Sequence, residues 1–312
     1  MPLNSQDKTM KSSRIEEKRR EPAQFAPSVA PPRGVLHAPE DRGTGFYHQR
    51  IATPPQLSPF IQHFWYVQWD HRGIAPGVAE TLPHPSCYLV FEHDLEKPIA
   101  DPCVLQRAEV SGVYTGKFSR SMEGLGRVFG LKFQPGGIFP YLQKSVSVLT
   151  DRVIPAEQVF GSGINALAEL LRSQSTPEAM ANVTSSYLLS DLPNPDRSCE
   201  LAAELVSAIL NDSDILTVEF LSRRCGLSVR ALQRLFKMYI GVTPKWVIRR
   251  YRLHEVLERF NYGEGFNGAQ LAIDLGYADQ AHLINDFRKL AGVSPTEYIR
   301  RVRKERHTTS NI

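Results

Sequence analysis

The sequence predicts a multidomain protein in which an α+β, β-rich domain is followed by an all-α domain. Three observations support this prediction. Residues 50–150 contain strand-forming runs, residues 138–190 repeat apolar positions at helical spacing, and the segment after residue 197 contains an internal repeat. We expect a disordered tail at 1–45, the α+β domain at 46–190, a linker at 191–197, the helical domain at 198–304 and a tail at 305–312.

The first 45 residues are polar, charged and rich in proline. Such a segment buries too little apolar surface to offset the entropy lost on ordering, so it predicts disorder. It contains one basic triplet, Lys18-Arg19-Arg20. For this triplet, exposure to solvent is favoured over a contact with nucleic acid.

The β-rich domain is predicted from aromatic and β-branched runs bounded by turn residues. These runs are Phe60–Trp69, Tyr88–Phe91 and Gly126–Phe133, the last of which stops at Pro135-Gly136-Gly137. Helical spacing then predicts one helix around Ile164–Leu171 and another from Pro177 to Leu189. Two prolines in Asp191–Asp196 break this pattern and predict the linker.

Positive charge is concentrated in the C-terminal third of the chain. Residues 213–312 hold 17 Lys and Arg against 10 Asp and Glu, whereas residues 1–212 hold 20 against 23. A net positive domain beside a net negative one favours a polyanionic partner for the former.

The cysteines and the hydropathy pattern exclude several classes of protein. Four cysteines without a C-x-x-C pair predict neither a zinc site nor a disulfide framework. The sequence shows no secretory signal peptide and no apolar run of about 18 residues that could span a bilayer. We therefore expect a cytoplasmic protein with reduced thiols and without a membrane partner.

The segment after the linker repeats itself with an offset of about 50 residues. Gly226 aligns with Gly276, and Phe236 aligns with Phe287 after one inserted residue. Gly241-Val242-Thr243-Pro244 then matches Gly292-Val293-Ser294-Pro295. Because glycine, proline and aromatic positions recur in order, the two copies are expected to fold alike.

Each copy has the pattern of a helix-turn-helix unit. A short amphipathic helix ends at a glycine that can adopt positive φ, and Ser228 or Asp279 then caps a second helix. We place the first unit at about 217–240 and the second at about 268–291. The second helix of each unit has one apolar stripe and one polar face. The polar faces carry Arg230, Gln233, Arg234 and Lys237 in the first copy, and Gln280, His282, Asn285, Arg288 and Lys289 in the second.

These residues have the chemistry of major-groove recognition, because Arg and Gln form bidentate hydrogen bonds with base edges. A helix predicted at 244–260 connects the two units and is about 26 Å long at 1.5 Å per residue. A rod of this length can hold two recognition helices roughly one DNA turn apart, so one chain would cover two consecutive major-groove segments.

The segment 198–304 resembles the AraC/XylS-type DNA-binding domain of bacterial transcription regulators. The most specific stretches are Leu275–His282, Phe287-Arg288-Lys289 and Gly292–Tyr298. The resemblance implies seven helices and two recognition helices in adjacent major grooves. It implies base contacts by Arg230, Gln233, Arg234, Gln280, Ala281, His282 and Asn285, the last standing where the family often has arginine. We expect phosphate contacts from Lys237, Arg249, Arg250, Arg288, Lys289, Arg300 and Arg301.

Residues 50–190 resemble an uncharacterised domain that often precedes this DNA-binding domain, which implies sensing of a small molecule or dimerisation. The aromatic residues Phe64, Trp65, Tyr66 and Trp69 are interpreted as core rather than as an effector pocket, whose position stays unassigned. His84, Glu92, His93 and Asp94 do not share one strand face, so we expect no metal site. Cys87 beside His84 is interpreted as a small buried residue rather than a nucleophile.

The sequence thus favours a sequence-specific double-stranded-DNA-binding transcription factor, associated with the nucleoid and without a cofactor or catalytic activity. A small-molecule effector, a second copy of the chain and RNA polymerase are further partners under this hypothesis. Two alternatives stay open. One is a DNA-repair enzyme fused to the same DNA-binding domain, and the other is a dimeric regulator that responds to no ligand.

Overall fold

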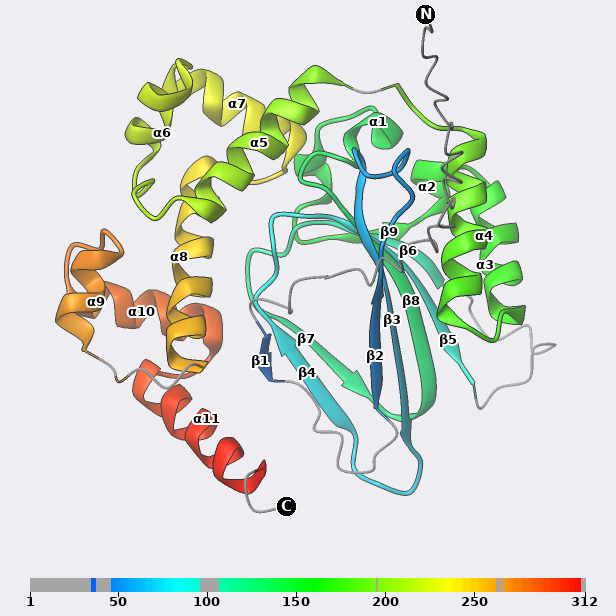
Figure 1. The fold of residues 1–312 in the computed structure, drawn as a ribbon, viewed down its shortest axis with the longest axis horizontal. Coiled ribbons are helices and arrows are strands. Elements are labelled where there is room, and N and C mark those ends of the chain that lie inside the picture. The colour runs from blue at the N-terminus through cyan, green and yellow to red at the C-terminus, as the bar shows by residue number, and fades with distance from the viewer. Residues whose placement is uncertain are drawn as a thin grey trace, which may run out of the picture.

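The computed structural model describes residues 35–37, 46–95, 107–194, 196–261, 265 and 267–309. It contains the two domains in the predicted order: a β-rich domain with flanking helices, and a helical domain (Figure 1). No helix among the described residues is long and apolar enough to cross a membrane.

A six-stranded antiparallel sheet forms the centre of the first domain. Its strand order is β2-β3-β8-β5-β6-β9. The strands are β2 (Tyr47–Ile51), β3 (Ile61–His71), β8 (Gly124–Phe133), β5 (Tyr88–Asp94), β6 (Arg107–Ser111) and β9 (Val153–Pro155). The three runs predicted from the sequence form β3, β5 and β8. These strands are adjacent in the sheet, in the order β3-β8-β5.

Helices cover one face of this sheet. Two helices, α3 (Gly163–Ser173) and α4 (Pro177–Ser190), pack against it, where Ile164 and Leu171 meet Phe64 and Phe129 in one apolar cluster. Shorter elements complete this layer: α1 (Phe139–Leu142), the 3-10 helix η1 (Val146–Leu149) and α2 (Glu157–Phe160).

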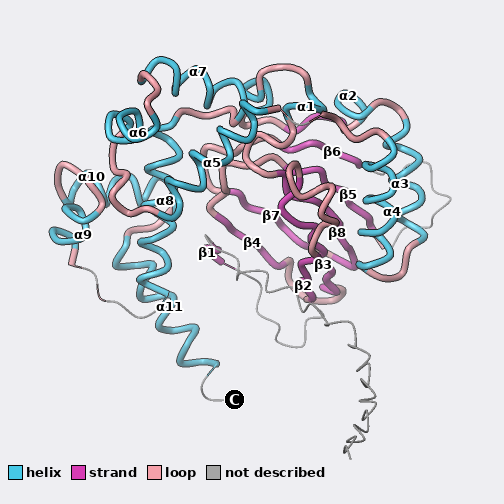
Figure 2. Tube along the Cα trace, turned by 45° about the horizontal axis from the view of Figure 1, so that its top comes forward, coloured by secondary structure: helices cyan, strands magenta, loops and turns pink. Residues whose placement is uncertain are grey.

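A three-stranded antiparallel sheet lies over the other face (Figure 2). It consists of β1 (Val35–His37), β4 (Gly77–Thr81) and β7 (Phe118–Met122) in the order β1-β4-β7. Strand β1 belongs to the segment for which the sequence predicts disorder, and the prediction is wrong there because β1 pairs with the edge of β4. Lys18-Arg19-Arg20 lies outside the described residues.

Seven helices make up the described part of the second domain, the number that the family resemblance implies. They are α5 (Arg197–Asn211), α6 (Val218–Cys225), α7 (Val229–Tyr239), α8 (Pro244–Asn261), α9 (Gly268–Asp274), α10 (Gln280–Ala291) and α11 (Pro295–Thr309). Helix α11 continues to Thr309, whereas a tail was expected from residue 305, because no helix-breaking residue interrupts this polar segment.

Helix α8 is the axis of the second domain (Figure 1). Val247 and Tyr251 in its first half belong to the apolar cluster of the first helix-turn-helix unit and the β-rich domain. Val256 and Phe260 in its second half belong to a separate cluster with the second unit. Because it packs against both units and the β-rich domain, α8 also buries the polar residues Arg250, Arg252 and His254.

The two domains are in direct contact. The Thr150 hydroxyl donates to the Gly241 carbonyl oxygen at 2.7 Å, and the Ser145 hydroxyl donates to the Lys237 carbonyl oxygen at 3.1 Å. The rings of Phe139 and Tyr239 lie 4.4 Å apart. These contacts join the 3-10 helix η1 and its surroundings to the C-terminal end of α7.

Candidate nucleic-acid interface and cavity

Local hydrogen bonds fix the turn of the first helix-turn-helix unit. Thr217 caps the start of helix α6, where its side chain accepts from the Phe220 amide at 3.1 Å, and Gly226 caps its end with φ of 71°. This φ is strained for any residue with a Cβ, which explains the glycine. Ser228 then caps α7 by accepting from the Ala231 amide at 3.2 Å. The predicted cap and turn are therefore present.

Helix α7 separates its apolar and polar residues. Leu232 and Phe236 are fully buried. The four polar residues predicted on the opposite face are all exposed: Arg230, Gln233, Arg234 and Lys237. Within the described part of the chain, none of these four side chains forms a hydrogen bond or an ion pair, so their donors are available to a partner.

The second unit repeats this construction. Asn267 caps α9 by accepting from the Gln270 amide at 3.2 Å, and Gly276, in the turn after α9, has φ of 70°. Asp279 caps α10 by accepting from the His282 amide at 2.7 Å. On α10, Leu283 and Phe287 are buried. The predicted base-contacting residues Gln280, Ala281, His282 and Asn285 are exposed.

Two of the polar side chains in the second unit contact neighbouring residues. The His282 ring lies edge-on to Tyr277 at 5.3 Å, and its Nε2 is 3.4 Å from an Arg249 guanidinium nitrogen. The Gln280 amide lies over Gly268, where a Cβ atom would come within 2.5 Å of it. The second unit therefore presents a less accessible set of donors than the first.

Arg249 connects α8 to the second recognition helix. Its guanidinium forms an ion pair with Asp286 on the inner side of α10, and that carboxylate is 11% exposed. The sequence predicts that Arg249 contacts phosphate. In the structure its charge is compensated by Asp286, which makes it a residue that holds α10 against α8.

Arg250 is buried, which contradicts the prediction that it contacts phosphate. Its side chain is 1% exposed, stacks on Trp246 at 4.5 Å and donates to the Thr115 carbonyl oxygen at 2.5 Å. Burial lowers the pKa of Arg250 to about 10, so it remains a cation at neutral pH. This residue links the centre of the helical domain to the loop between β6 and β7.

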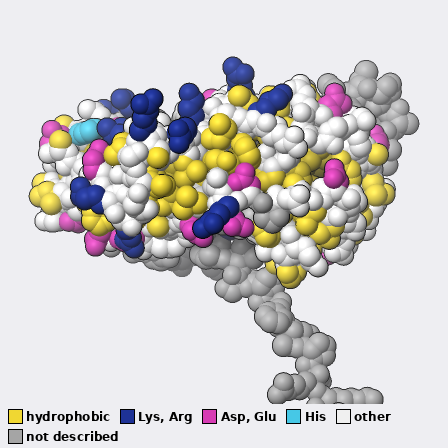
Figure 3. Space-filling model, turned by 90° about the horizontal axis from the view of Figure 1, so that it is seen from above, with side chains coloured by type: hydrophobic (Ala, Val, Ile, Leu, Met, Phe, Trp, Pro, Cys, Tyr) yellow, Lys and Arg dark blue, Asp and Glu magenta, His cyan; other side chains and the backbone are white. Residues whose placement is uncertain are grey.

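The other predicted phosphate contacts lie at the surface: Arg288, Lys289, Arg300 and Arg301. Arg301 donates to Glu297 one helical turn earlier at 2.8 Å. Figure 3 shows Lys and Arg side chains along one edge of the molecule, several of them over the end that holds the helical domain. This distribution of charge suits a nucleic-acid backbone.

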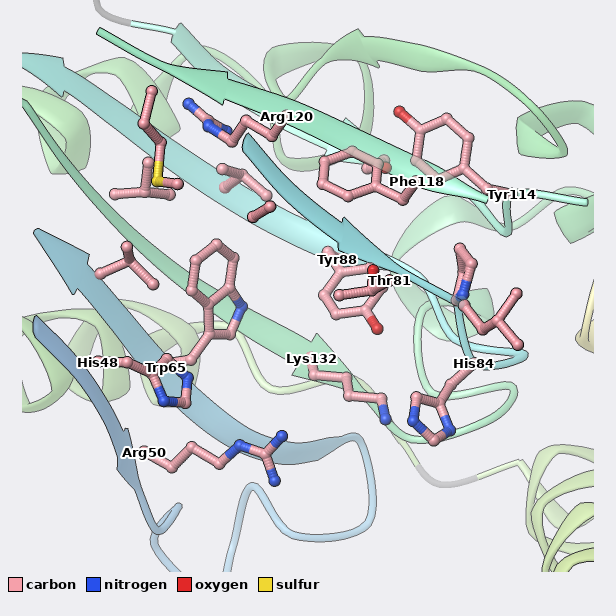
Figure 4. A pocket seen from close by; sticks show the side chains of 18 of the residues that line it. His48, Arg50, Trp65, Thr81, His84, Tyr88, Tyr114, Phe118, Arg120 and Lys132 are labelled. Carbon is pink, nitrogen blue, oxygen red and sulfur yellow. The ribbon is translucent and has the colours of Figure 1, made fainter. Parts of the chain in front are cut away.

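A cavity of about 360 Å³ lies between the two sheets of the first domain (Figure 4). Side chains from β2, β3, β4, β5, β7 and β8 line it. The cavity was not expected from the sequence, because the aromatic residues of β3 were all interpreted as core. In the structure, Phe64 and Tyr66 face the helices, whereas Trp65 and Trp69 face the cavity.

Cross-strand glycines give the two indoles their position. Trp65 pairs with Gly130 and Trp69 pairs with Gly126 on β8. A Cβ atom at Gly130 would lie 2.7 Å from the Trp65 ring, and one at Gly126 would lie 2.4 Å from the Trp69 ring. Both indoles therefore lie flat against β8 because these positions have no side chain.

The residues of the first domain that were considered as metal ligands or as a nucleophile do not come together in one site. His93 is buried, and Glu92 pairs with Arg120. The described residues contain no group of three or more His, Cys, Asp or Glu side chains that could hold a metal ion. Burial raises the pKa of the Cys87 thiol to about 12, so Cys87 is a poor nucleophile at neutral pH.

Comparisons with known proteins agree with these features. Residues 221–301 match a helix-turn-helix domain family, and residues 49–155 match a domain of unknown function, DUF6597. The chain is 29% identical over 277 residues to the HTH-type transcriptional activator RhaS of Pectobacterium carotovorum subsp. carotovorum (strain PC1), covering 81% of this chain and 94% of the relative.

Two solved structures are also similar. A transcriptional regulator with an AraC-type DNA-binding domain from Chromobacterium violaceum is 24% identical, with 32% of this chain and 88% of that chain covered and a TM-score of 0.29. ToxT from Vibrio cholerae is 10% identical, with 82% and 98% covered and a TM-score of 0.36.

The repeated helix-turn-helix units, their capping residues and the matching relative agree on one assignment. The chain carries a helix-turn-helix DNA-binding domain behind a domain of unknown function, and it is similar along most of its length to a transcriptional activator.

Proposed function

We propose that one copy of this chain binds two consecutive major-groove segments of double-stranded DNA, with α7 in one segment and α10 in the next. The observation that carries this proposal is the presence of two exposed polar helix faces on units connected by α8. That helix has 18 residues and is about 27 Å long. Successive major-groove segments on one face of DNA are about 34 Å apart, a separation that suits the two units.

The proposed base contacts are Arg230, Gln233 and Arg234 from α7, and Gln280, Ala281, His282 and Asn285 from α10. Lys237, Arg288, Lys289, Arg300 and Arg301 are proposed to contact phosphates. Because the donors of α7 are unengaged and two side chains of α10 contact neighbours, we infer that α7 contributes most of the specificity. Competition between a selected operator and random duplex at fixed salt tests this function. Equal affinity for both would contradict it.

We also propose that a small molecule in the cavity changes how the two recognition helices are presented to DNA. Three contacts support this coupling. Thr115 accepts from Arg250, the His84 ring lies 4.6 Å from the His254 ring, and Leu82 packs in the apolar cluster of the second unit. His84 and Leu82 also line the cavity, as does Tyr114 next to Thr115. A ligand that moves these residues would act directly on α8.

Replacing Arg250 by methionine should loosen the loop that carries Thr115, because the Thr115 carbonyl oxygen would lose a charged donor. We expect the amides of residues 113–117 to exchange with solvent about tenfold faster, from a loss of roughly 1.5 kcal/mol. Hydrogen-exchange mass spectrometry of the full chain measures this. Lys245→Met, on the exposed side of the same helix, is the control. Unchanged exchange in the Arg250 variant would contradict the proposed coupling.

A second copy of the chain and RNA polymerase are further proposed partners, and the nucleoid in the cytoplasm is the proposed location. Sedimentation of the chain with a selected operator distinguishes one bound copy from two.

A further inference from the structure

Lys132 lies inside the cavity between the two sheets (Figure 4). It belongs to β8, and its cross-strand neighbours are His63 on β3 and Tyr88 on β5. Side chains of directly paired residues lie on the same face of a sheet, and all three line the cavity. The fold therefore holds a lysine amine beside an imidazole and a phenol in a mostly enclosed space.

No carboxylate compensates the charge of Lys132. The described residues that line the cavity include no Asp or Glu. Lys132 is 7% exposed and forms no hydrogen bond or ion pair with a described residue. A buried ammonium group without a partner is costly, and release of its proton removes that cost without a counterion. The position of Lys132 thus favours the neutral amine.

The pKa of Lys132 agrees with this geometry. Burial, with a further contribution from the Arg50 charge, lowers it to about 7. About half of the Lys132 amines are then neutral at pH 7, whereas an ordinary lysine is neutral in roughly one molecule in 2,500. A neutral amine is a nucleophile, and desolvation in an apolar pocket is one way in which proteins activate a lysine.

The two neighbours of Lys132 suit a reaction with a carbonyl group. Burial and nearby cations lower the pKa of His63 to about 3, so its ring is uncharged at pH 7. Burial raises the pKa of Tyr88, so its phenol keeps its proton. The Tyr88 hydroxyl forms no hydrogen bond with a described residue. It can therefore donate to the oxygen of a carbonyl group that approaches Lys132.

Most of the remaining lining is apolar. It includes Trp65, Trp69, Val90, Met122 and Val128. The flat indoles provide a broad surface for an aromatic ring or an alkyl chain. A ligand with many hydroxyl groups would leave most of them without partners against this surface.

We propose that the cavity binds an aldehyde with an apolar body, which Lys132 captures as a Schiff base. This inference rests on the proposed effector response and names the ligand class. The apolar body lies along Trp65 and Trp69, and the aldehyde group lies at Lys132.

Capture proceeds in two stages. The lone pair of the Lys132 nitrogen attacks the carbonyl carbon, a C–N bond forms, and the π electrons pass to the oxygen, which takes up a proton. The Tyr88 phenol stabilises the charge that develops on this oxygen. The C–O bond then breaks and a C=N bond forms. The nitrogen loses both of its protons over the two stages and the oxygen leaves as water, so no oxidant or reductant takes part.

Reductive trapping on the full chain tests the proposal. The protein is incubated at pH 7 with octanal or 1-naphthaldehyde and with sodium cyanoborohydride, which reduces a Schiff base to a stable secondary amine. Peptide mass spectrometry then locates the adduct. At least one of the two aldehydes should label Lys132 about tenfold or more faster than any exposed lysine, because more of its amine is neutral. Labelling of Lys132 that is absent, or no faster than at exposed lysines, overturns the proposal.

Glyceraldehyde tests the requirement for an apolar body, because it has the same reactive group on a polar body. Relative to labelling of the exposed Lys144, it should label Lys132 about tenfold less than the apolar aldehyde does. Equal relative labelling by both aldehydes overturns the ligand class.

Variants identify the reacting residue. Lys132→Met should lose the fast adduct, whereas Lys144→Met, in the segment after α1, should keep it. Tyr88→Phe keeps the ring and should slow labelling about tenfold or more, through loss of the donor to the carbonyl oxygen. A fast adduct that persists in Lys132→Met overturns the proposal, and an unchanged rate in Tyr88→Phe contradicts the role of the phenol. Thermal unfolding of each variant verifies that it is folded.

DNA affinity is measured separately by fluorescence anisotropy, before and after trapping. Lys132→Met treated in the same way corrects for labelling of lysines in the helical domain. Trapping at Lys132 without a change in DNA affinity supports the ligand class and contradicts the effector response. A specific DNA complex without trapping at Lys132 supports the DNA-binding function and overturns the ligand class.

Discussion

Arg234→Ala should weaken binding to the preferred operator by about 1–3 kcal/mol, a factor of roughly 5 to 150, and should relax the preference at the base pair that it contacts. Arg234 is exposed on α7 and has no partner within the described chain, so its full fork of donors is available to a guanine. The measurement is anisotropy at fixed salt, on the operator and on operators with single base changes.

Lys237→Ala is the matched comparison, because Lys237 lies one turn later on the same exposed face. It should weaken all sequences about equally and reduce the salt dependence by about one phosphate contact. If Arg234→Ala also weakens all sequences equally, Arg234 contacts phosphate rather than a base.

Arg252→Ala should destabilise the helical domain by about 3–5 kcal/mol, because two carbonyl oxygens each lose a charged donor at a cost of about 1.5–3 kcal/mol. The Arg252 side chain is 3% exposed and donates to the carbonyl oxygens of Asp212 and Ile215 at 3.0 and 2.8 Å. Asp212 and Ile215 lie between α5 and α6, so these hydrogen bonds hold α8 against the segment that leads into the first unit. Denaturant unfolding followed by circular dichroism measures the loss.

Arg259→Ala is the control for this experiment. Arg259 lies on the same helix and pairs with Glu255 at 2.6 Å, but its side chain is 32% exposed. An ion pair that accessible contributes about 0–1 kcal/mol. Similar losses in the two variants would contradict the role given to Arg252.

The helix-turn-helix units could be predicted from the sequence because their signals are local. Gly226, Ser228 and Asp279 determine turns and caps within a few residues of themselves, and the repeat shows the pattern twice. The surroundings of α8 could not be predicted in this way. Arg250 was expected at the surface as a basic residue, but the β-rich domain covers it through Thr115, more than a hundred residues earlier in the chain.

The cavity could not be predicted from the sequence, for a related reason. Its second wall is the β4–β7 pair, whose short strands Gly77–Thr81 and Phe118–Met122 mix polar and apolar residues without a clear pattern. Period-two alternation could have separated Trp65 from Phe64, but only that second wall shows that the outer face of β3 is covered. Lys132 likewise lies on a strand in which residues alternate between the two faces. A charged residue is expected on an exposed face, so its burial could not be predicted.

Selection of bound sequences from a random DNA pool, followed by footprinting of one copy of the chain, tests the central claim most directly. We expect two blocks of preferred base pairs about 10 base pairs apart on one face of the duplex, the stronger block next to α7. Arg234→Ala should then flatten the stronger block alone. A single block protected by one copy, or two blocks that respond equally to Arg234→Ala, would contradict DNA recognition by two unequal units.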